Sequence, residues 1–143
     1  MQDTAKQPQR VLFLCTHNSA RSQMAEGLLR GLGGVEFDVF SAGTVATRVR
    51  PEAIAVMREL GIDSSEQHSK TLDQFLSEKF DEVITVCDQA NESCPVFPGA
   101  LHRRHWSVDD PSGVEGSEEQ RLEAFRQARD ELRRRIEAEL LAQ

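Results

Sequence analysis

Continuous apolar runs and amphipathic stretches alternate along the chain, and they predict strands separated by helices. Two runs, at 11–15 and 82–87, are uninterrupted by charge apart from Glu82, which is typical of strands covered on both faces in a parallel sheet. Two further strands are predicted at 35–42 and, more weakly, at 101–106. Helical periodicity and boundary residues predict helices at 20–32, 51–60, 72–77 and 117–141. Strands alternating with helices indicate an α/β sandwich around a parallel sheet.

The final helix has the clearest helical periodicity in the chain. An apolar stripe runs along it, and Arg and Glu cover the other faces; the stripe comprises Leu122, Phe125, Leu132, Ile136 and Leu140. Because crossovers between parallel strands are right-handed, the loops that follow the strands should gather at one edge of the sheet. Ligands usually bind at that edge in such folds.

Length and charge limit the class of protein. The 143 residues fit one domain, which we place at 10–143 after a polar, flexible leader at 1–9. No apolar run is long enough to span a bilayer, and the leader lacks the apolar stretch of a secretion signal, so we expect a cytoplasmic monomer. The net charge of -7, from 24 acidic and 17 basic residues, argues against a nucleic-acid partner. An anionic ligand would need a local concentration of donors.

Such a concentration is predicted where the first strand runs into the first helix, at Cys15-Thr16-His17-Asn18-Ser19-Ala20-Arg21-Ser22. A helix N-terminus offers unpaired N–H groups and a partial positive charge, which together bind a tetrahedral oxyanion. Arg21 can add a bidentate fork to the same anion. Cys15, at the mouth of this loop, should carry thiolate near neutral pH and act as a nucleophile.

Two further polar residues of this loop should support the sulfur. Ser22 can donate a hydroxyl hydrogen bond to Cys15. Asn18 tolerates a left-handed backbone and can hydrogen-bond across the loop. The motif is short, so its placement between a strand and a helix carries the interpretation.

Three segments together resemble the low-molecular-weight protein tyrosine phosphatases. They are the loop with Gln23-Met24-Ala25-Glu26-Gly27 after it, Ser41-Ala42-Gly43-Thr44, and Asp109-Asp110-Pro111. More specifically, the chain is similar to the arsenate reductases that share this fold and are recycled by thioredoxin, from about Val11 to the final helix. The resemblance implies a three-layer sandwich in which a four-stranded parallel sheet has helices on both faces.

Three cysteines favour the reductases over the phosphatases. An odd number of thiols in a reducing compartment is not a disulfide framework. Cys87 ends the third predicted strand as Cys15 ends the first, and the resemblance makes these strands neighbours. Cys94 follows seven residues later, about 10 Å further along if the segment is helical, so a Cys87–Cys94 bond requires unwinding. The polar stretch 88–99, with two prolines and a glycine, should be loosely held.

The resemblance implies a mechanism without metal or organic cofactor. Cys15 attacks arsenate, Cys87 attacks Cys15 so that arsenite leaves, and Cys94 attacks Cys87. The resulting disulfide is reduced by thioredoxin. Asp110 is the expected acid because Pro111 fixes the backbone beside it, and Asp109 is the second candidate.

Some positions depart from the family's pattern. His17 stands where the phosphatases usually have Gly, and we expect it to face solvent. Ser112, rather than an aromatic residue, follows the Asp-Pro pair, and the chain has no Tyr, which argues against aryl phosphates as substrates. Asn18, Glu26 and Ser41 match a potassium site of some reductases, but Lys70 replaces its aspartate, so no metal is predicted.

Two alternatives remain open on the sequence. In the first, the protein is a phosphatase of this fold, in which Cys87 and Cys94 are core residues. In the second, Cys87, Cys94, His102 and His105 bind a metal ion, although the spacing between the cysteines is wider than in usual zinc pairs.

Overall fold

The computed structural model describes residues 7–88 and 95–141. Its strands and α-helices, in chain order, are β1 Gln9–Cys15, α1 Arg21–Gly33, β2 Phe37–Gly43, α2 Pro51–Arg58, β3 Phe80–Thr85, β4 Ala100–His105 and α3 Glu118–Ile136. Short 3-10 turns are η1 Gly34–Glu36, η2 Leu72–Phe75 and η3 Pro111–Gly113, and a π-helical turn, η4 Glu137–Leu141, extends α3. Within the described ranges no helix is both long and apolar enough to cross a membrane.

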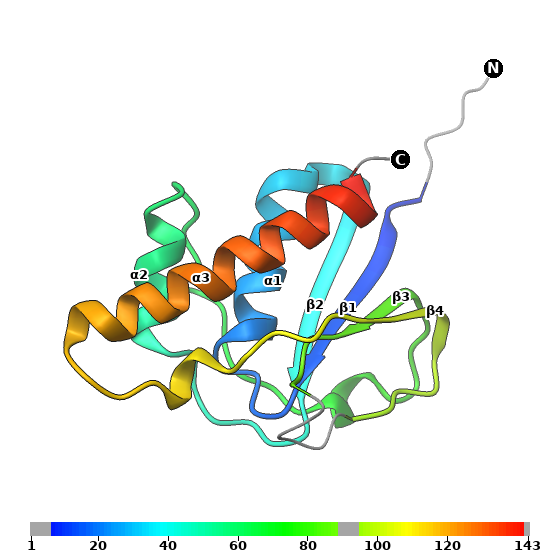
Figure 1. Ribbon diagram of the computed structural model, residues 1–143. Coiled ribbons are helices and arrows are strands. Elements are labelled where there is room, and N and C mark those ends of the chain that lie inside the picture. Colours follow the sequence, from blue (N-terminus) through cyan, green and yellow to red (C-terminus); the bar gives the residue numbers. More distant parts are fainter. Residues whose placement is uncertain (1–6, 89–94, 142–143) are drawn as a thin grey trace.

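The four strands form one parallel sheet in the order β2-β1-β3-β4 (Figure 1). In the register of the central pair, Leu12 lies opposite Val83 and Leu14 lies opposite Thr85. The predicted parallel sheet is therefore confirmed, and so is the adjacency of the first and third strands. Since parallel strands end at the same edge, the residues that follow β1 and β3 lie close together.

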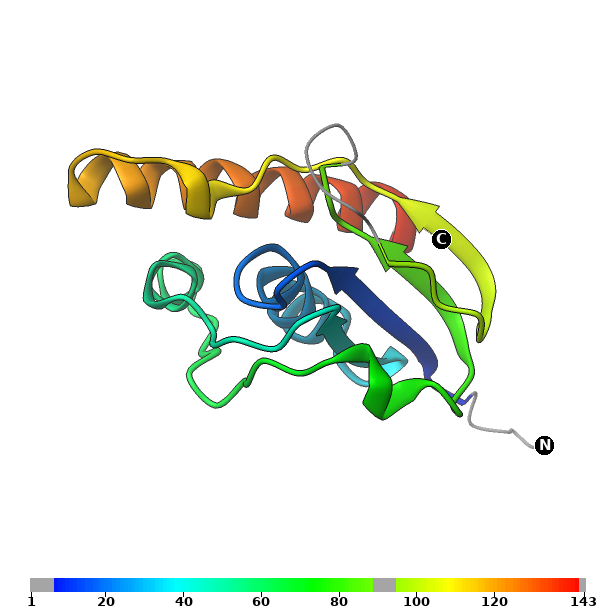
Figure 2. The ribbon, with the colours of Figure 1, turned by 90° about the horizontal axis from the view of Figure 1, so that it is seen from below.

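The sheet has a hydrophobic core on each face, because successive side chains of a strand point to opposite sides. On one face Val11, Phe13 and Ile84 pack against α1, α2 and α3. On the other, Leu12, Leu14 and Val83 pack against Phe75 of η2 and against Phe97. Figure 2 shows the orange and red α3 and the green η2 on opposite sides of the sheet, which gives the three layers that were predicted.

Boundary residues explain where the two later helices begin. Pro51 opens α2, where its missing N–H costs no hydrogen bond. Ser117 caps α3 in a capping box: its hydroxyl accepts from the Gln120 N–H, and the Gln120 side chain accepts from the Ser117 N–H. The predicted apolar stripe of α3 is confirmed, with Phe125, Leu132 and Ile136 at most 1% exposed.

Several predicted boundaries differ from the structure. The third strand ends at Thr85, two residues before Cys87. The second begins at Phe37, because 34–36 forms a 3-10 turn in which Val35 is 92% exposed. The helix predicted at 72–77 is a single 3-10 turn. These boundaries were predicted from the apolar pattern alone, and that pattern does not indicate where the hydrogen bonds of a strand or helix stop.

The prediction that the whole stretch 88–99 is loosely held is wrong at Phe97. This side chain is 1% exposed, and its ring centroid lies 5.6 Å from that of Phe80. Arg103 also donates to the Phe97 carbonyl at 2.8 Å. Burial of this large apolar side chain in the core on the η2 face of the sheet therefore holds the chain at Phe97, which the polar composition of the stretch did not indicate. Residues 89–94 lie outside the described ranges.

Candidate active site

Cys15 ends β1, and the next five residues form a loop that leads into α1 at Arg21. The sulfur is nearly enclosed, with Cys15 2% exposed. Gly43 lies opposite Cys15 in the β1–β2 register and packs against the backbone of the loop. A Cβ at Gly43 would lie 2.7 Å from the Thr16 carbonyl oxygen and 2.8 Å from the Asn18 nitrogen, so only glycine fits there. In the sequence, only the position of Gly43 in a family motif pointed to this constraint.

Asn18 holds the loop together from its centre. Its φ of 51° is the left-handed conformation that the sequence predicted. The side-chain oxygen accepts two hydrogen bonds of 2.9 Å, from the Lys70 N–H and from Gln23 Nε2. These two donors identify the remaining amide atom, Nδ2, as the one that faces Ser22 Oγ at 2.7 Å and Ser41 Oγ at 2.9 Å.

The hydroxyl of Ser22 therefore has a hydrogen to donate to the nucleophile. Ser22 Oγ lies 2.8 Å from Cys15 Sγ, and geometry alone allows either atom to donate. Because Ser22 Oγ already accepts from Asn18, its own hydrogen is available for the sulfur. A hydrogen bond donated to sulfur favours a thiolate over a thiol. The predicted contact between Ser22 and Cys15 is present in the structure.

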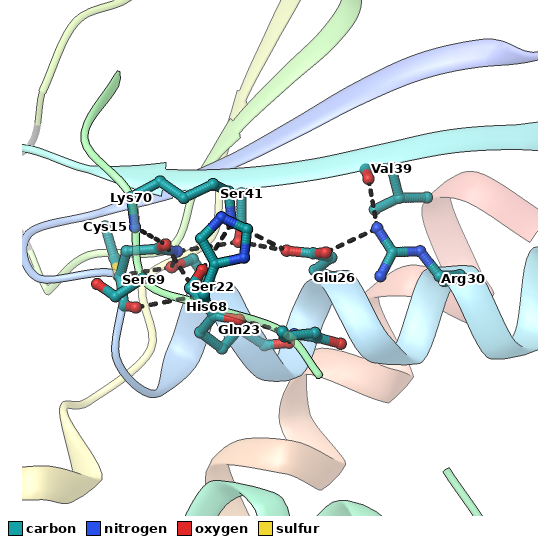
Figure 3. Close-up of polar contacts among 12 residues, drawn as sticks. Cys15, Ser22, Gln23, Glu26, Arg30, Val39, Ser41, His68, Ser69 and Lys70 are labelled. Carbon is teal, nitrogen blue, oxygen red and sulfur yellow. Dashed lines mark hydrogen bonds and ion pairs between the residues drawn. The ribbon is translucent and has the colours of Figure 1, made fainter. Parts of the chain in front are cut away.

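The same amide anchors a second polar chain that leads away from the sulfur. Ser41 Oγ accepts from Asn18 and donates to Glu26 Oε1 at 2.5 Å, and Glu26 Oε2 pairs with Arg30 at 2.7 Å (Figure 3). Lys70 Nζ lies 3.8 Å from Glu26 Oε1. Burial lowers the pKa of Lys70 from its ordinary value, although the Glu26 carboxylate opposes this shift. The Lys70 amino group thus lies beside Glu26, one of the residues that match the family's potassium site.

Arg21 connects two loops: the loop at 15–22, which we call the anion loop, and the loop at 108–111, which carries Asp110. Its guanidinium is 3% exposed, with Nη1 donating to the Val108 carbonyl at 2.9 Å and Nη2 lying 3.6 Å from Asp110 Oδ2. Asp110 is 41% exposed, and its carboxylate also accepts from the Ser112 N–H at 2.9 Å. The structure therefore places Asp110 at the entrance to the loop, attached to the same arginine that the sequence assigned to the oxyanion.

Cys87 lies beside the nucleophilic loop, across the central strand pair. The Val86 N–H donates to the Leu14 carbonyl at 2.9 Å, and Cys87 Sγ lies 4.0 Å from the same oxygen. Cys87 is 0% exposed. Two sulfurs, each one residue beyond this Val86–Leu14 hydrogen bond, therefore share one corner of the sheet. Cys94 lies outside the described residues, so the predicted distance between Cys87 and Cys94 stays a prediction.

The remaining sequence-predicted residues surround the entrance. Thr16 and Ser19 are half-buried, Ala20 is buried, and His17 is exposed, as expected of it. A pocket of about 580 Å³ opens beside the loop, lined by Thr16, His17, Asp88, Asp109, Asp110, Gly113 and Val114. Asp109 and Asp110 both line it, so the geometry of the pocket does not distinguish between them as the acid. Of these two carboxylates, Asp110 is the one that forms an ion pair with Arg21 in the described part of the chain.

The metal-binding alternative required His102 and His105 to meet the cysteines. His102 is exposed on β4, and His105 Nδ1 lies 2.7 Å from Thr85 Oγ1. In residues 7–88 and 95–141, no three His, Cys, Asp or Glu side chains group as metal ligands.

Comparisons with known proteins agree with this geometry. Residues 10–143 match the family model described as low molecular weight phosphotyrosine protein phosphatase. The chain is 49% identical over 126 residues to an arsenate reductase of Halalkalibacterium halodurans, an alignment that covers 88% of this chain and 91% of that protein. The chain therefore belongs to the low-molecular-weight phosphotyrosine protein phosphatase family, among its arsenate reductases.

Two solved structures refine this placement. One is described as an arsenate reductase in the phosphate-binding state; it is 38% identical, with a TM-score of 0.78, and the match covers 91% of this chain and 95% of that one. The other is the thioredoxin-dependent arsenate reductase of Corynebacterium glutamicum, 28% identical with a TM-score of 0.69, matched over 98% of this chain and 66% of that one.

Proposed function

We propose that this protein reduces arsenate to arsenite with electrons carried by its own cysteines, and that thioredoxin regenerates it. One observation carries the proposal. Cys15 and Cys87 are both buried at the carboxyl edge of adjacent strands, and Cys87 Sγ lies 4.0 Å from the carbonyl of the residue before Cys15. A phosphatase of this fold has no need of a second thiol at that place.

The first step uses the anion loop. The N–H groups of residues 16–22 and the Arg21 fork bind arsenate, and Cys15 thiolate attacks the arsenic atom. Asp110 donates a proton to the departing hydroxide, which leaves as water. The Ser22 hydroxyl, with its hydrogen directed at the sulfur, stabilises the thiolate before the attack.

The second step transfers the electron pair. Cys87 thiolate attacks Cys15 Sγ, the Cys15–Cys87 disulfide forms, and the electrons of the sulfur–arsenic bond pass to arsenic, which leaves as arsenite. Cys94 then attacks Cys87 Sγ and expels Cys15 as a thiolate. Ser22 helps here too, because a stabilised thiolate is a better leaving group. Thioredoxin then reduces the Cys87–Cys94 disulfide. The Corynebacterium relative, which is described as thioredoxin-dependent, supports this choice of reductant.

Cys94→Ser is the decisive variant. It should reduce one equivalent of arsenate and then stop as a Cys15–Cys87 disulfide, whereas Cys15→Ser should reduce none. Peptide mapping of the stalled protein identifies the bond. Repeated turnover with thioredoxin, or a mapped bond other than Cys15–Cys87, would show that the relay is wrong.

Hydrolysis of phosphate esters is the second candidate, favoured by the same loop and by Asp110 beside Arg21. Thiol titration before and after one equivalent of arsenate separates the two functions. A reductase loses two thiols for each arsenite formed, and a phosphatase loses none.

A further inference from the structure

The outer wall of the anion loop is a segment that follows β2, residues 44–50, which we name the strap. The strap is attached to the loop by backbone hydrogen bonds near both of its ends. The Val45 N–H donates to the Thr16 carbonyl at 3.0 Å, and the Arg50 N–H donates to the Ser19 carbonyl at 2.9 Å. Any side chain between these two points is therefore held near the rim of the loop.

The strap carries two arginines with different surroundings. Arg50 is half-buried and lies 3.4 Å from Glu52, so part of its charge is balanced. Arg48 is exposed and forms no ion pair with any residue in the described part of the chain. Both arginines line a pocket of about 350 Å³ that His17 and Asp110 also line. The strap side of the rim is thus basic.

The pocket that adjoins it on the rim has the reverse character. The pocket of about 580 Å³ there is lined by Asp88, Asp109 and Asp110, and His17 and Asp110 belong to both pockets. One of its lining residues, Asp88, directly follows Cys87 in the chain. An oxyanion approaching from that side would meet carboxylates first, in a protein whose net charge is already -7.

We propose that arsenate reaches Cys15 from the strap side and that Arg48, assisted by Arg50, steers the anion to the loop. This rests on the proposed function for the identity of the anion. A local positive field raises the encounter rate of an anion with its site, and the gain falls as salt screens it.

The test compares charge reversal at Arg48 with charge reversal far away. Arg48→Glu should lower kcat/KM for arsenate by about 10-fold at low ionic strength and by much less at 0.5 M salt. Arg48→Gln should give a smaller loss, and kcat should be unchanged in both. The control is Lys79→Glu, an exposed residue just before β3, at the amino edge of the sheet. It makes the same change in net charge and should leave kcat/KM near the parent value.

A second readout does not depend on the relay. Iodoacetate, an anion, and iodoacetamide, a neutral analogue, both alkylate a thiolate, and peptide mapping restricts the measurement to Cys15. Arg48→Glu should lower the ratio of the iodoacetate rate to the iodoacetamide rate, while Lys79→Glu should not. If the parent makes no arsenite but this ratio still falls, the basic entrance stands and the reductase assignment fails. Equal ratios and equal kcat/KM in the two variants, or a loss confined to kcat, would overturn the steering role.

Discussion

Asn18 determines the hydrogen-bond direction at the nucleophile, although it does not touch the sulfur in any described contact. Its oxygen is occupied by Lys70 and Gln23, so its two amide hydrogens go to Ser22 and Ser41. The Ser22 hydrogen is then left for Cys15. A single amide in a left-handed backbone thereby shapes the loop and directs a donor at the thiolate.

Ser22→Ala should slow arsenate reduction by about 10- to 100-fold, because one hydrogen bond to a charged group contributes about 1.5–3 kcal/mol. The substitution keeps the helix and leaves Arg21 in place, so binding of phosphate as a competitive inhibitor should change little. Steady-state kinetics with arsenate and phosphate measure both effects. Ser65→Ala, a remote and exposed serine, is the matched control. A full parental rate in Ser22→Ala would remove Ser22 from the mechanism.

Asp110→Asn should lower the rate of the first chemical step by about 10²–10⁴-fold, the usual contribution of a general acid. Asparagine still accepts from the Ser112 N–H, so the turn that holds the loop should persist. Single-turnover kinetics, monitored through the loss of free thiols, isolate this step. Asp109→Asn serves as the comparison, and a larger loss there than at Asp110 would reverse the assignment.

At the scale of elements, α2 and α3 are joined by a cluster of charges rather than by apolar contact alone. Glu59, at the C-cap of α2, bonds Arg126 at 2.9 Å and Arg129 at 2.8 Å, both on α3. Arg129 is 8% exposed and also donates to the Val56 carbonyl at 2.8 Å. α2 directly follows the strap, so this cluster contributes to holding the outer wall of the anion loop in place.

The pairing of Glu59 predicts an acid-sensitive contribution to stability. Hydrogen bonds from Arg126, then from Arg129, lower the pKa of Glu59 from its ordinary value. A lowered folded-state pKa stabilises the fold above the unfolded pKa of about 4.3, and the stabilisation is lost as the pH falls through the folded pKa.

Glu59→Gln should therefore cost about 0.5–1 kcal/mol at pH 7, a value reduced by solvent screening because the side chain is 39% exposed. The difference from the parent protein should begin to shrink as the pH falls below the unfolded pKa of about 4.3, and it should be lost as the pH falls through the lowered folded-state pKa. Urea unfolding at pH 7, 5 and 3.5 measures it. A difference that stays constant across this range would mean that the carboxylate charge contributes nothing.

Across the whole molecule, the two faces of the sheet serve different purposes. The face under α1, α2 and α3 carries the buried sulfurs Cys15 and Cys87 within its core. The other face is smaller and rich in aromatic residues, with Phe80 in contact with the rings of Phe40, Phe75 and Phe97. Phe97, three residues after Cys94 in the sequence, is buried in this second core.

Phe97→Ala should destabilise the protein by about 3–5 kcal/mol, the usual cost of removing a buried aromatic ring. The neighbouring Val96 is 80% exposed, and Val96→Ala should change stability by less than about 0.5 kcal/mol. Urea denaturation of the two variants compares them directly. A cost below about 1 kcal/mol at Phe97 would mean that the segment leaves the core without penalty, in line with the loose segment that the sequence suggested.

Local pattern by itself determined the order of elements and the position of the anion loop. The apolar run at 11–15, the helix start at Pro51 and the stripe of α3 each report the burial of nearby residues, and each is present in the structure. The same reasoning placed Cys15, Asn18 and Ser22 in one loop at a strand–helix junction. These features depend on neighbours a few residues away, which periodicity and boundary residues can register.

Tertiary structure alone decided which distant segments complete the site. The Lys70 N–H that fixes the Asn18 amide comes from 52 residues away, and Arg21 meets a carbonyl 87 residues further along. Arg48 lines a pocket with His17 because the strap is hydrogen-bonded to the loop, and Phe97 is buried because it packs with Phe75 of η2 and Phe80 of β3. Such contacts depend on strand order and on the paths that the chain takes between strands. The number of residues between two positions does not by itself predict how far apart they lie in the fold.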